Sequence, residues 1–262
     1  MATGDLDGNG LDDLVVDFGS PYGVYAWMNH ATWRFLHPMS PTKMIVGDFD
    51  NTGKDDVVFD FTGYGLWRFA NNSAWAPLHS LSAVQLAVGN LDGAGGDELL
   101  VSFAGFGLWA YSEASGWTSL HGLTPTQLLT ADLDNNGAAD VVAAFPGLGV
   151  WSFLNRTTWT QIHQLVPTRM AAGDLDGTAQ DDLVIDFGTQ FGIWALRNRT
   201  TWAFLHPLSS KGLLLADVDG NGIDDVIIDF GPGIGLWSYV NNSTWGQVHG
   251  LSPAAMTAGR FH

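Results

Sequence analysis

The segment GDLDGNGLDD at residues 4–13 opens the first of six similar copies within the sequence. Related segments begin at residues 47, 89, 131, 173 and 216, and the first loop position of each copy follows the previous one by 42 or 43 residues. A fixed period in this range predicts stacked copies of one supersecondary unit. The repeat therefore decides the fold, and its aspartate-rich opening indicates a ligand.

The fourth copy shows the content of one unit. Its segments are short, contain many β-branched or aromatic residues, and are separated by Asp, Asn, Gly or Pro, as is typical of strands joined by tight turns. No segment is long or periodic enough for a helix. The four strands expected in this copy are residues 127–131, 141–145, 150–154 and 159–163.

Four-stranded units at this period are typical of β-propellers. We expect an all-β, six-bladed propeller with four antiparallel strands per blade and a calcium-binding loop between the first and second strand of each blade. A solenoid is the alternative, but its repeats are usually shorter and its ends carry polar caps. We expect one domain over residues 1–262, with blades at approximately 1–42, 43–84, 85–126, 127–168, 169–211 and 212–253.

The end of the chain resembles its beginning. Residues 256–259 read MTAG and align with MATG at residues 1–4. We therefore expect residues 254–262 to form a ring-closing strand, because an exposed strand edge invites aggregation. This gives one inner strand more than six blades require. A fragment of a larger ring is the alternative, and the terminal strand that closes the ring stays open.

The composition limits the partners and the chemistry. The 262 residues include 27 acidic and 10 basic side chains, and a net charge of −17 argues against binding to nucleic-acid phosphates. No apolar run reaches 18 residues, so we expect no membrane insertion. The absence of cysteine excludes disulfides and thiolate–metal chemistry. No signal-peptide pattern precedes the first repeat, so we expect an excised domain.

The loop of each copy has the pattern of a calcium loop. Positions 1, 3 and 5 offer side-chain oxygens, position 7 a backbone carbonyl and position 9 a closing carboxylate, with glycine at the turn in position 6. The fifth copy has Ala179 at that turn. The expected ligands are Asp5, Asp7, Asn9, Leu11 and Asp13; Asp48, Asp50, Thr52, Lys54 and Asp56; Asp132, Asp134, Asn136, Ala138 and Asp140; Asp174, Asp176, Thr178, Gln180 and Asp182; and Asp217, Asp219, Asn221, Ile223 and Asp225.

The third loop is degraded. It keeps Asp92 and Glu98 but has Asn90, Ala94 and Gly96 at the other ligand positions, so we expect it to bind metal most weakly. Calcium, about one ion per blade, fits flexible oxygen-rich loops better than magnesium does. Zinc is disfavoured without cysteine or clustered histidine. Simple Asx-turns between strands are the alternative interpretation.

These loops, followed by strands such as DLVV and a Phe-Gly pair, resemble the FG-GAP repeats of integrin alpha-subunit propellers and, more closely, the bacterial and fungal FG-GAP/VCBS families. The resemblance covers essentially the whole chain. It implies structural calcium that ties the first two strands of a blade together, and secretion to an extracellular or periplasmic location. It also implies functions such as sugar binding between blades, adhesion, or attachment to an enzyme.

Aromatic residues recur in register and indicate the core between blades. One column holds Phe18, Phe61, Phe103, Phe145, Phe187 and Phe230, and another holds Tyr25, Trp67, Trp109, Trp151, Trp194 and Trp237. In the last strand a tryptophan precedes a histidine by four residues, which predicts that both lie on one face. These pairs are Trp33 and His37, Trp75 and His79, Trp117 and His121, Trp159 and His163, Trp202 and His206, and Trp245 and His249.

Each histidine either bonds to the backbone of a neighbouring blade or serves as a polar group beside an aromatic sugar site. We expect the recurring Asp17, Asp60, Asp186 and Asp229 to be surface charges, with polar contacts to a ligand as the alternative. We interpret the sequons at Asn71, Asn155, Asn198 and Asn241 as turn residues unless the host is eukaryotic.

A catalytic site needs one asymmetric constellation, and no such motif occurs in the sequence. We therefore expect a non-enzymatic, calcium-binding, lectin-like module that binds glycans or cell-surface molecules. A protein-interaction or scaffolding module of a larger secreted protein, and a propeller attached to an enzyme, are the alternatives. The sugar and the oligomeric state stay open.

Overall fold

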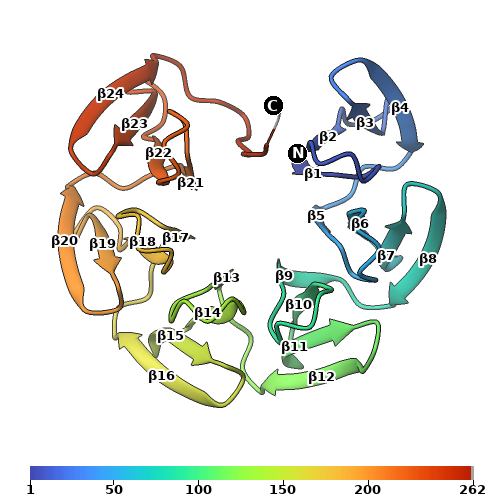
Figure 1. The fold of residues 1–262 in the computed structure, drawn as a ribbon, viewed down its shortest axis with the longest axis horizontal. Helices are drawn as coiled ribbons and strands as arrows, with labels where there is room; N and C mark the ends of the chain where they lie inside the picture. The colour runs from blue at the N-terminus through green and yellow to red at the C-terminus, as the bar shows by residue number, and fades with distance from the viewer. Residues whose placement is uncertain (261–262) are drawn as a thin grey trace. The chain divides into compact units, whose positions relative to one another are not determined.

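The computed structural model describes residues 1–260. Its 24 strands form six four-stranded sheets, each antiparallel and each joined in chain order, and no helix occurs in this range (Figure 1). The six-bladed β-propeller expected from the repeat is confirmed, with each sheet as one blade. Within these residues there is accordingly no helix that could cross a membrane.

The chain divides into two compact units, and the first contains blades 1 to 3. It comprises residues 1–90 and 94–124 together with the segment that begins at Thr257. Its strands are β1 (Ala2–Gly4), β2 (Asp13–Asp17), β3 (Val24–Met28) and β4 (Thr32–His37); β5 (Lys43–Gly47), β6 (Asp56–Phe61), β7 (Gly65–Ala70) and β8 (Ala74–His79); and β9 (Ala83–Gly89), β10 (Glu98–Phe103), β11 (Gly107–Ser112) and β12 (Gly116–His121).

The second unit contains blades 4 to 6 and comprises residues 91–93 and 125–256. The single closed domain expected from the repeat stays a prediction. The strands of this second unit are β13 (Gln127–Ala131), β14 (Asp140–Phe145), β15 (Gly149–Leu154) and β16 (Thr158–His163); β17 (Arg169–Gly173), β18 (Asp182–Asp186), β19 (Ile193–Arg197) and β20 (Thr201–His206); and β21 (Gly212–Ala216), β22 (Asp225–Asp229), β23 (Leu236–Val240) and β24 (Thr244–His249).

The second strand of a blade lies deepest in the core. Every residue of β6, β10, β14 and β18 is buried, because these strands are apolar on both faces and packed on both sides. In the first unit, Val57 and Phe59 of β6 cluster with Val15 and Val24 of the first blade. In the second unit, the equivalent cluster joins Val142 of β14 to its neighbours in the fifth blade.

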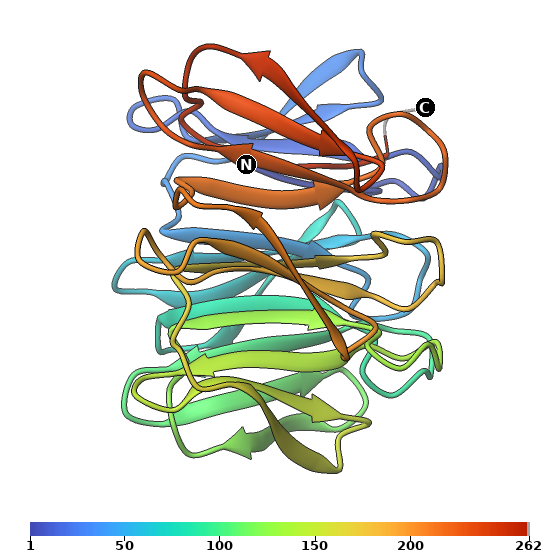
Figure 2. The same ribbon diagram turned by 90° about the vertical axis from the view of Figure 1, so that its left-hand side faces the viewer.

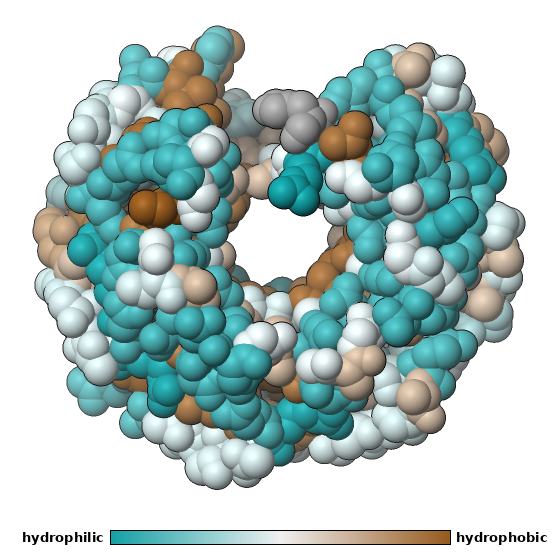
Figure 3. Space-filling view, in the orientation of Figure 1, coloured by the Kyte–Doolittle hydropathy of each residue, from teal (hydrophilic) through white to brown (hydrophobic). Residues whose placement is uncertain are grey.

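The fourth strand of each blade is its outer edge and is largely exposed, for example in β8 and β16. Pro77 lies in β8, where a missing N–H costs no interior ladder bond. Figure 2 shows the blades from the side, with their strands crossing in a twisted antiparallel arrangement. The face in Figure 3 is mostly hydrophilic, in keeping with a net charge of −17.

A half-buried aspartate joins the loops of neighbouring blades. The backbone N–H of Asp55 donates to the carbonyl of Asp5, and the N–H of Asp5 donates to Asp55 Oδ2, both at 2.7 Å. Asp97 makes the same pair of bonds to Asp48. Burial raises the pKa of Asp55 to about 6, because its carboxylate is removed from water at this junction.

The C-terminal segment uses the same bonding pattern without forming a strand. The N–H of Asp12 donates to the carbonyl of Arg260, and the N–H of Arg260 donates to Asp12 Oδ2, both at 2.7 Å. The expectation of a strand at 254–262 is wrong for residues 254–260, and residues 261–262 lie outside the described range. The segment therefore docks on the first blade through its backbone, as a first loop residue does elsewhere.

Three of the recurring aspartates near the ends of the second strands, Asp60, Asp186 and Asp229, are buried and are not the surface charges expected from the sequence, whereas Asp17 is half-buried. Asp60 and Asp186 are fully buried. Asp60 Oδ2 accepts the N–H of Ala83, at the start of the next blade, at 2.8 Å. Asp186 Oδ2 accepts the N–H of Ser210 at 2.6 Å in the same way. These carboxylates thus hold the connection from one blade to the next, which explains their recurrence.

Candidate functional site

The first aspartate of each loop shapes the turn. Asp5 Oδ1 accepts the N–H groups of Gly8 at 2.7 Å and Asn9 at 3.0 Å, and Asp5 Oδ2 accepts the N–H of Gly10 at 2.6 Å. In the sixth loop, the same backbone bonds hold the pKa of Asp217 below its usual range. The turn of the sixth loop therefore favours the ionised form of Asp217.

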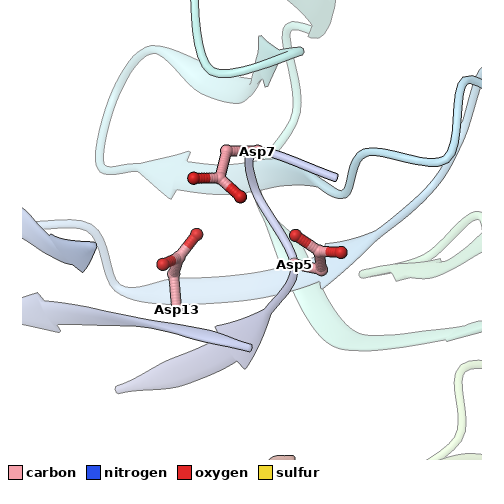
Figure 4. Close-up of side chains that lie close together, drawn as sticks. All are labelled: Asp5, Asp7 and Asp13. Atoms are coloured by element: carbon pink, nitrogen blue, oxygen red, sulfur yellow. The ribbon is translucent and has the colours of Figure 1, made fainter. Parts of the chain in front are cut away.

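Three carboxylates converge inside four of the loops. Figure 4 shows Asp5, Asp7 and Asp13 directed toward the space between them, and one oxygen from each lies within 4.8 Å of the others. The buried Oδ1 atoms of Asp7 and Asp134 have no hydrogen-bond partner. Orphaned, converging carboxylate oxygens fit a hard cation. The other three groups are Asp132, Asp134 and Asp140; Asp174, Asp176 and Asp182; and Asp217, Asp219 and Asp225.

Burial makes three of the closing carboxylates costly to ionise without a counterion. The closing Asp182 lies at the start of β18, and desolvation raises its pKa to about 6, with Asp176 and Asp174 adding repulsion. Desolvation also raises the pKa of Asp13 and of Asp140. A bound cation would offset this cost directly, because it interacts favourably with the charged form.

The side chains at position 5 are occupied by the turn. Asn9 Oδ1 accepts the N–H of Leu11 at 2.8 Å, and Asn136 Oδ1 accepts the N–H of Ala138 at 2.7 Å. Thr178 donates its hydroxyl to Asp176 Oδ1 at 2.8 Å. The ligand roles expected for position 5 and for the carbonyls at position 7 stay predictions.

An asparagine in the turn between the third and fourth strands supports the loop in five of the six blades, a role that the sequence analysis did not identify. The backbone N–H of Asn155 donates to the closing Asp140 at 2.7 Å, and its side-chain Nδ2 donates to Asp134 at 2.6 Å. The sequence feature that could have indicated this role is an asparagine that recurs at a nearly constant spacing after the loop, and the sequence analysis assigned it to turn chemistry alone. The equivalent residues are Asn29, Asn71, Asn198 and Asn241.

The second loop differs from the four loops with converging carboxylates because an arginine lies among its carboxylates. Nη2 of Arg68, in β7, lies 2.5 Å from Asp50 Oδ2 and 2.6 Å from Asp56 Oδ2. A guanidinium thus lies among the carboxylates proposed as ligands. The sequence held a signal, because a charged residue within an apolar strand needs a buried partner. Thr52 donates its hydroxyl to Asn71 Oδ1 at 2.7 Å, and the ligand roles of Asp48 and Lys54 stay predictions.

The third loop does not appear among the groups of three converging carboxylates in the described residues. Asp92 Oδ2 lies 3.6 Å from Nη1 of Arg156. The positive charge beside Asp92 is therefore the guanidinium of Arg156, a side chain of the fourth blade. The weak metal binding of the third loop stays a prediction.

The expectation that the tryptophan and the histidine of each last strand lie on one face of the sheet is wrong. In the second blade Phe69 pairs with Trp75 and Trp67 pairs with Pro77, but Leu66 pairs with His79 because a bulge shifts the register. One extra residue moves the following side chain to the opposite face of the sheet. Trp75 therefore faces the first blade and His79 the third, and all six blades carry this bulge.

Histidine instead packs on aromatic rings of the next blade. The ring centroid of His37 lies 4.5 Å from Phe61 and 5.1 Å from Trp75. The same cluster recurs with His79, Phe103 and Trp117; His163, Phe187 and Trp202; and His206, Phe230 and Trp245.

Two of these clusters open into pockets. Between the first and second blades, a cavity of about 330 Å³ is lined by His37, Met39, Phe61, Tyr64, Trp67 and Trp75. Between the fourth and fifth blades, a cavity of about 220 Å³ is lined by His163, Leu165, Phe187, Phe191, Trp194 and Trp202. The two linings come from equivalent positions and differ only where Met39 and Tyr64 of the first correspond to Leu165 and Phe191 of the second, so the repeat builds a similar apolar pocket more than once.

The histidine of each pocket has a defined proton position. His37 Nδ1 accepts the N–H of Met39, and His163 Nδ1 accepts the N–H of Leu165, both at 3.1 Å. A neutral imidazole that accepts at Nδ1 carries its proton on Nε2. Burial lowers the pKa of His163, which favours this neutral form. The bond is made to the residue two positions along the same chain segment, not to a neighbouring blade.

Some hydrogen-bond donors of the pocket already donate to a backbone carbonyl, whereas others have no partner among the described residues. The indole N–H of Trp67 donates to the carbonyl of Tyr64 at 3.2 Å, and that of Trp194 donates to Phe191 at 2.8 Å. Within residues 1–260, the Nε2–H groups of His37 and His163 bond to no other protein atom. A ligand would therefore meet broad aromatic walls and at least one free donor.

The first copy differs from the others. Phe18 and Trp33 are exposed by 50% and 49%, whereas Phe61 is exposed by only 3%. The rings of Phe18 and Trp33 pack on each other at 5.3 Å, and Tyr25 contacts both. The expectation of buried aromatic columns is thus confirmed for Phe61, Phe103, Phe145 and Phe187 and is wrong for Phe18.

Similar folds occur in proteins with different functions. A lectin from Agrocybe aegerita, whose structure addresses recognition of non-reducing terminal N-acetylglucosamine, is 17% identical over 93% of this chain and 77% of its own, with a TM-score of 0.66. BBS1N in complex with ARL6DN is 15% identical over 96% and 79%, with a TM-score of 0.65. The GH74 xyloglucanase of Xanthomonas campestris is 14% identical over 94% and 44%, with a TM-score of 0.55.

These similarities establish the class of the protein as a β-propeller and no more, because all three identities are low. No family model matches the chain, and no curated protein matches it. The function therefore has to be argued from the loops and the pockets.

Proposed function

We propose that the protein is a calcium-stabilised, lectin-like propeller that binds terminal N-acetylated sugars in its repeated inter-blade pockets. The recurring cluster of histidine, phenylalanine and tryptophan carries this proposal. It places a free Nε2–H donor beside aromatic walls in an open pocket, once between blades 1 and 2 and again between blades 4 and 5.

The chemistry of the pocket favours a sugar over a charged ligand. Sugar rings present C–H groups on one face and hydroxyls at the edge, which suits aromatic walls with few polar groups. The pocket beside His37 is lined by carbon-rich residues such as Met39, Phe61 and Trp75 and by no charged side chain. An acetamido methyl group adds apolar contact that a plain hexose lacks. The N-acetylglucosamine lectin with the same fold supports this choice.

Calcium has a structural role in this proposal. The four loops with converging carboxylates connect the first and second strands of their blades, and each also holds an asparagine of the turn between the third and fourth strands. An ion bound there would connect three segments of one blade. The loops would then belong to the FG-GAP/VCBS type, and the protein would act outside the cell without catalysing a reaction.

Several weak and equivalent pockets would act together on a surface that displays many sugars. Linked sites raise overall avidity without any single tight contact. Histidine packs on the next blade's tryptophan in at least four places, which supports more than two such sites.

A glycan array tests the proposal directly. The protein in calcium should bind glycans that end in N-acetylglucosamine or N-acetylgalactosamine, and excess chelator should weaken the signal by destabilising the blades. The double variant Trp75→Ala/Trp202→Ala should lose most binding, while Trp33→Ala, outside both pockets, should keep it. A blank array with folded protein would instead support a protein-interaction or scaffolding module.

A further inference from the structure

Five of the six blades have a small residue in the middle of the third strand, and the second blade does not. Ala26, Ala110 and Ala195 stand there in three blades, and Ser152 and Ser238 stand there in two others. The second blade has Arg68. An arginine in this column is not explained by the strand, because its register with β6 is the same as that of alanine in the first blade.

The Arg68 side chain is buried at the centre of the second loop. Only 6% of the residue is exposed. Its Nη2 lies 2.5 Å from Asp50 Oδ2 and 2.6 Å from Asp56 Oδ2, and Asp56 is fully buried. The guanidinium therefore takes the position between the third-position and closing carboxylates, where the other loops leave those oxygens facing each other.

A third carboxylate fixes the other side of the guanidinium. Nη1 of Arg68 lies 2.9 Å from Glu113 Oε2 in the third blade, and the hydroxyl of Tyr111 donates to the same oxygen at 3.0 Å. Arg68 thus connects the second loop to the neighbouring blade. An ion bound within one loop would not make this additional contact with the third blade.

The charges show why the second loop retains its aspartates. A guanidinium stays protonated at any pH at which a protein is folded, and it cannot dissociate from the chain. The buried Asp56 and the half-buried Asp50 therefore share one permanent positive charge, which offsets one of their two negative charges. Removal of one member of such a buried group leaves an uncompensated charge, which is strongly destabilising.

We propose that Arg68 is a tethered cation that replaces the metal in the second loop, so that the protein binds four calcium ions and the second blade is held without one. This inference rests on the proposed calcium binding of the first, fourth, fifth and sixth loops. It predicts a latent fifth site, because Arg68→Ala gives the second blade the residue found in the first.

Counting bound calcium in matched variants tests the inference. Native mass spectrometry or calorimetric titration should find four ions in the unaltered protein. Asp134→Asn, in the fourth loop, should lower the count to three, whereas Asp50→Asn, at the same position of the second loop, should leave it at four. A fall in the count for Asp50→Asn would overturn the inference, because it would show that an ion is bound in the second loop of the unaltered protein.

The gain of a site gives a second and independent readout. Arg68→Ala should bind five ions, and Arg68→Ala/Asp50→Asn should return to four. In chelator, Arg68→Ala should melt below the unaltered protein, and calcium should raise its melting temperature by the larger amount. An Arg68→Ala protein that is folded in calcium but binds only four ions would contradict the inference.

Failure of the calcium proposal would look different. The unaltered protein and Asp134→Asn would then both bind no ion. In that case Arg68→Met should still lower the melting temperature, and Arg68→Met/Asp50→Asn/Asp56→Asn should recover much of the loss. No recovery would show that Arg68 does not act as the counterion of these carboxylates.

Discussion

His163 of the fourth blade packs on Trp202 of the fifth, with ring centroids 5.4 Å apart, although Trp159 precedes it by four residues on its own strand. The bulge between these two positions places them on opposite faces of the sheet. Each inter-blade site is therefore built from two blades: one supplies the donor and the next supplies the aromatic wall. This arrangement determines which variants should affect a single site.

Trp202→Ala should remove one sugar site without affecting the others. The indole forms a wall of the pocket beside His163, and loss of such a face should weaken that site at least tenfold, about 1.4 kcal/mol. Calorimetric titration with N-acetylglucosamine should show one site fewer. Trp33→Ala is the matched control, because the ring of Trp33 packs on Phe18, Tyr25 and Trp27 of its own blade and lies outside both pockets. An equal loss in both variants would contradict the assignment.

Sugar binding should weaken as the pH falls below about 6.5. Burial lowers the pKa of His79, His163 and His206, so the folded state binds fewer protons than the unfolded state. Their stabilising contribution is therefore present above pH 6.5 and lost as the pH falls. Protonation also places a hydrogen on Nδ1 and breaks the bond from the backbone of Leu165.

This pH dependence is measured by affinity and melting temperature between about pH 7.5 and 5, in saturating calcium. Calcium is needed because the buried aspartates act with the opposite sign. The pKa of Asp182 is raised to about 6, so its contribution to the metal-free fold is lost as the pH rises. In His163→Gln the affinity of that pocket should no longer depend on pH. A dependence that persists there would assign the effect to another group.

Chelation should lower the melting temperature of both units. An ion that binds only the native state stabilises it by about 2.7 kcal/mol when its concentration is a hundred times its dissociation constant. The first unit contains one group of converging carboxylates and the second contains three, so the second unit should lose more stability. Scanning calorimetry with and without excess chelator checks this. Identical curves after confirmed metal removal would exclude structural calcium.

Ala179→Gly should stabilise the fifth loop. Ala179 has φ of +61°, in the left-handed region that the other loops reach with glycine, and its N–H donates to Asp174 Oδ2 at 2.7 Å. Glycine adopts this backbone without strain, so we expect a gain of roughly 0.5–1 kcal/mol. Ala138→Gly, at a position without positive φ in the fourth loop, is the control and should give no gain. Denaturant unfolding measures both.

The repeat period was sufficient to predict the blades, because strand and turn chemistry recur at fixed spacing. The strands expected at 127–131 and 150–154 correspond to β13 and β15 to within one residue. The carboxylates of the first, fourth, fifth and sixth loops were also located, since ligand spacing is local in sequence. Such features depend on residues close together along the chain.

The errors concern relationships that alternation and spacing do not encode. The bulge cannot be inferred from the spacing of Trp75 and His79 in the sequence, yet it places the histidine on the opposite face of the sheet. Arg68 was missed because its partners lie in a loop and in another blade. The burial of Asp60 was missed because its partner, the N–H of Ala83, belongs to the next blade. Each case needs the packing of two blades, which one repeat does not contain.

The most direct test of the account is a crystal structure of the protein in calcium, soaked with N-acetylglucosamine. The account predicts sugar density in the pocket of His163, Phe187 and Trp202 and in the equivalent pocket of His37, Phe61 and Trp75, with a sugar oxygen within hydrogen-bond distance of each Nε2. Empty pockets at saturating sugar, or density confined to other surfaces, would contradict it.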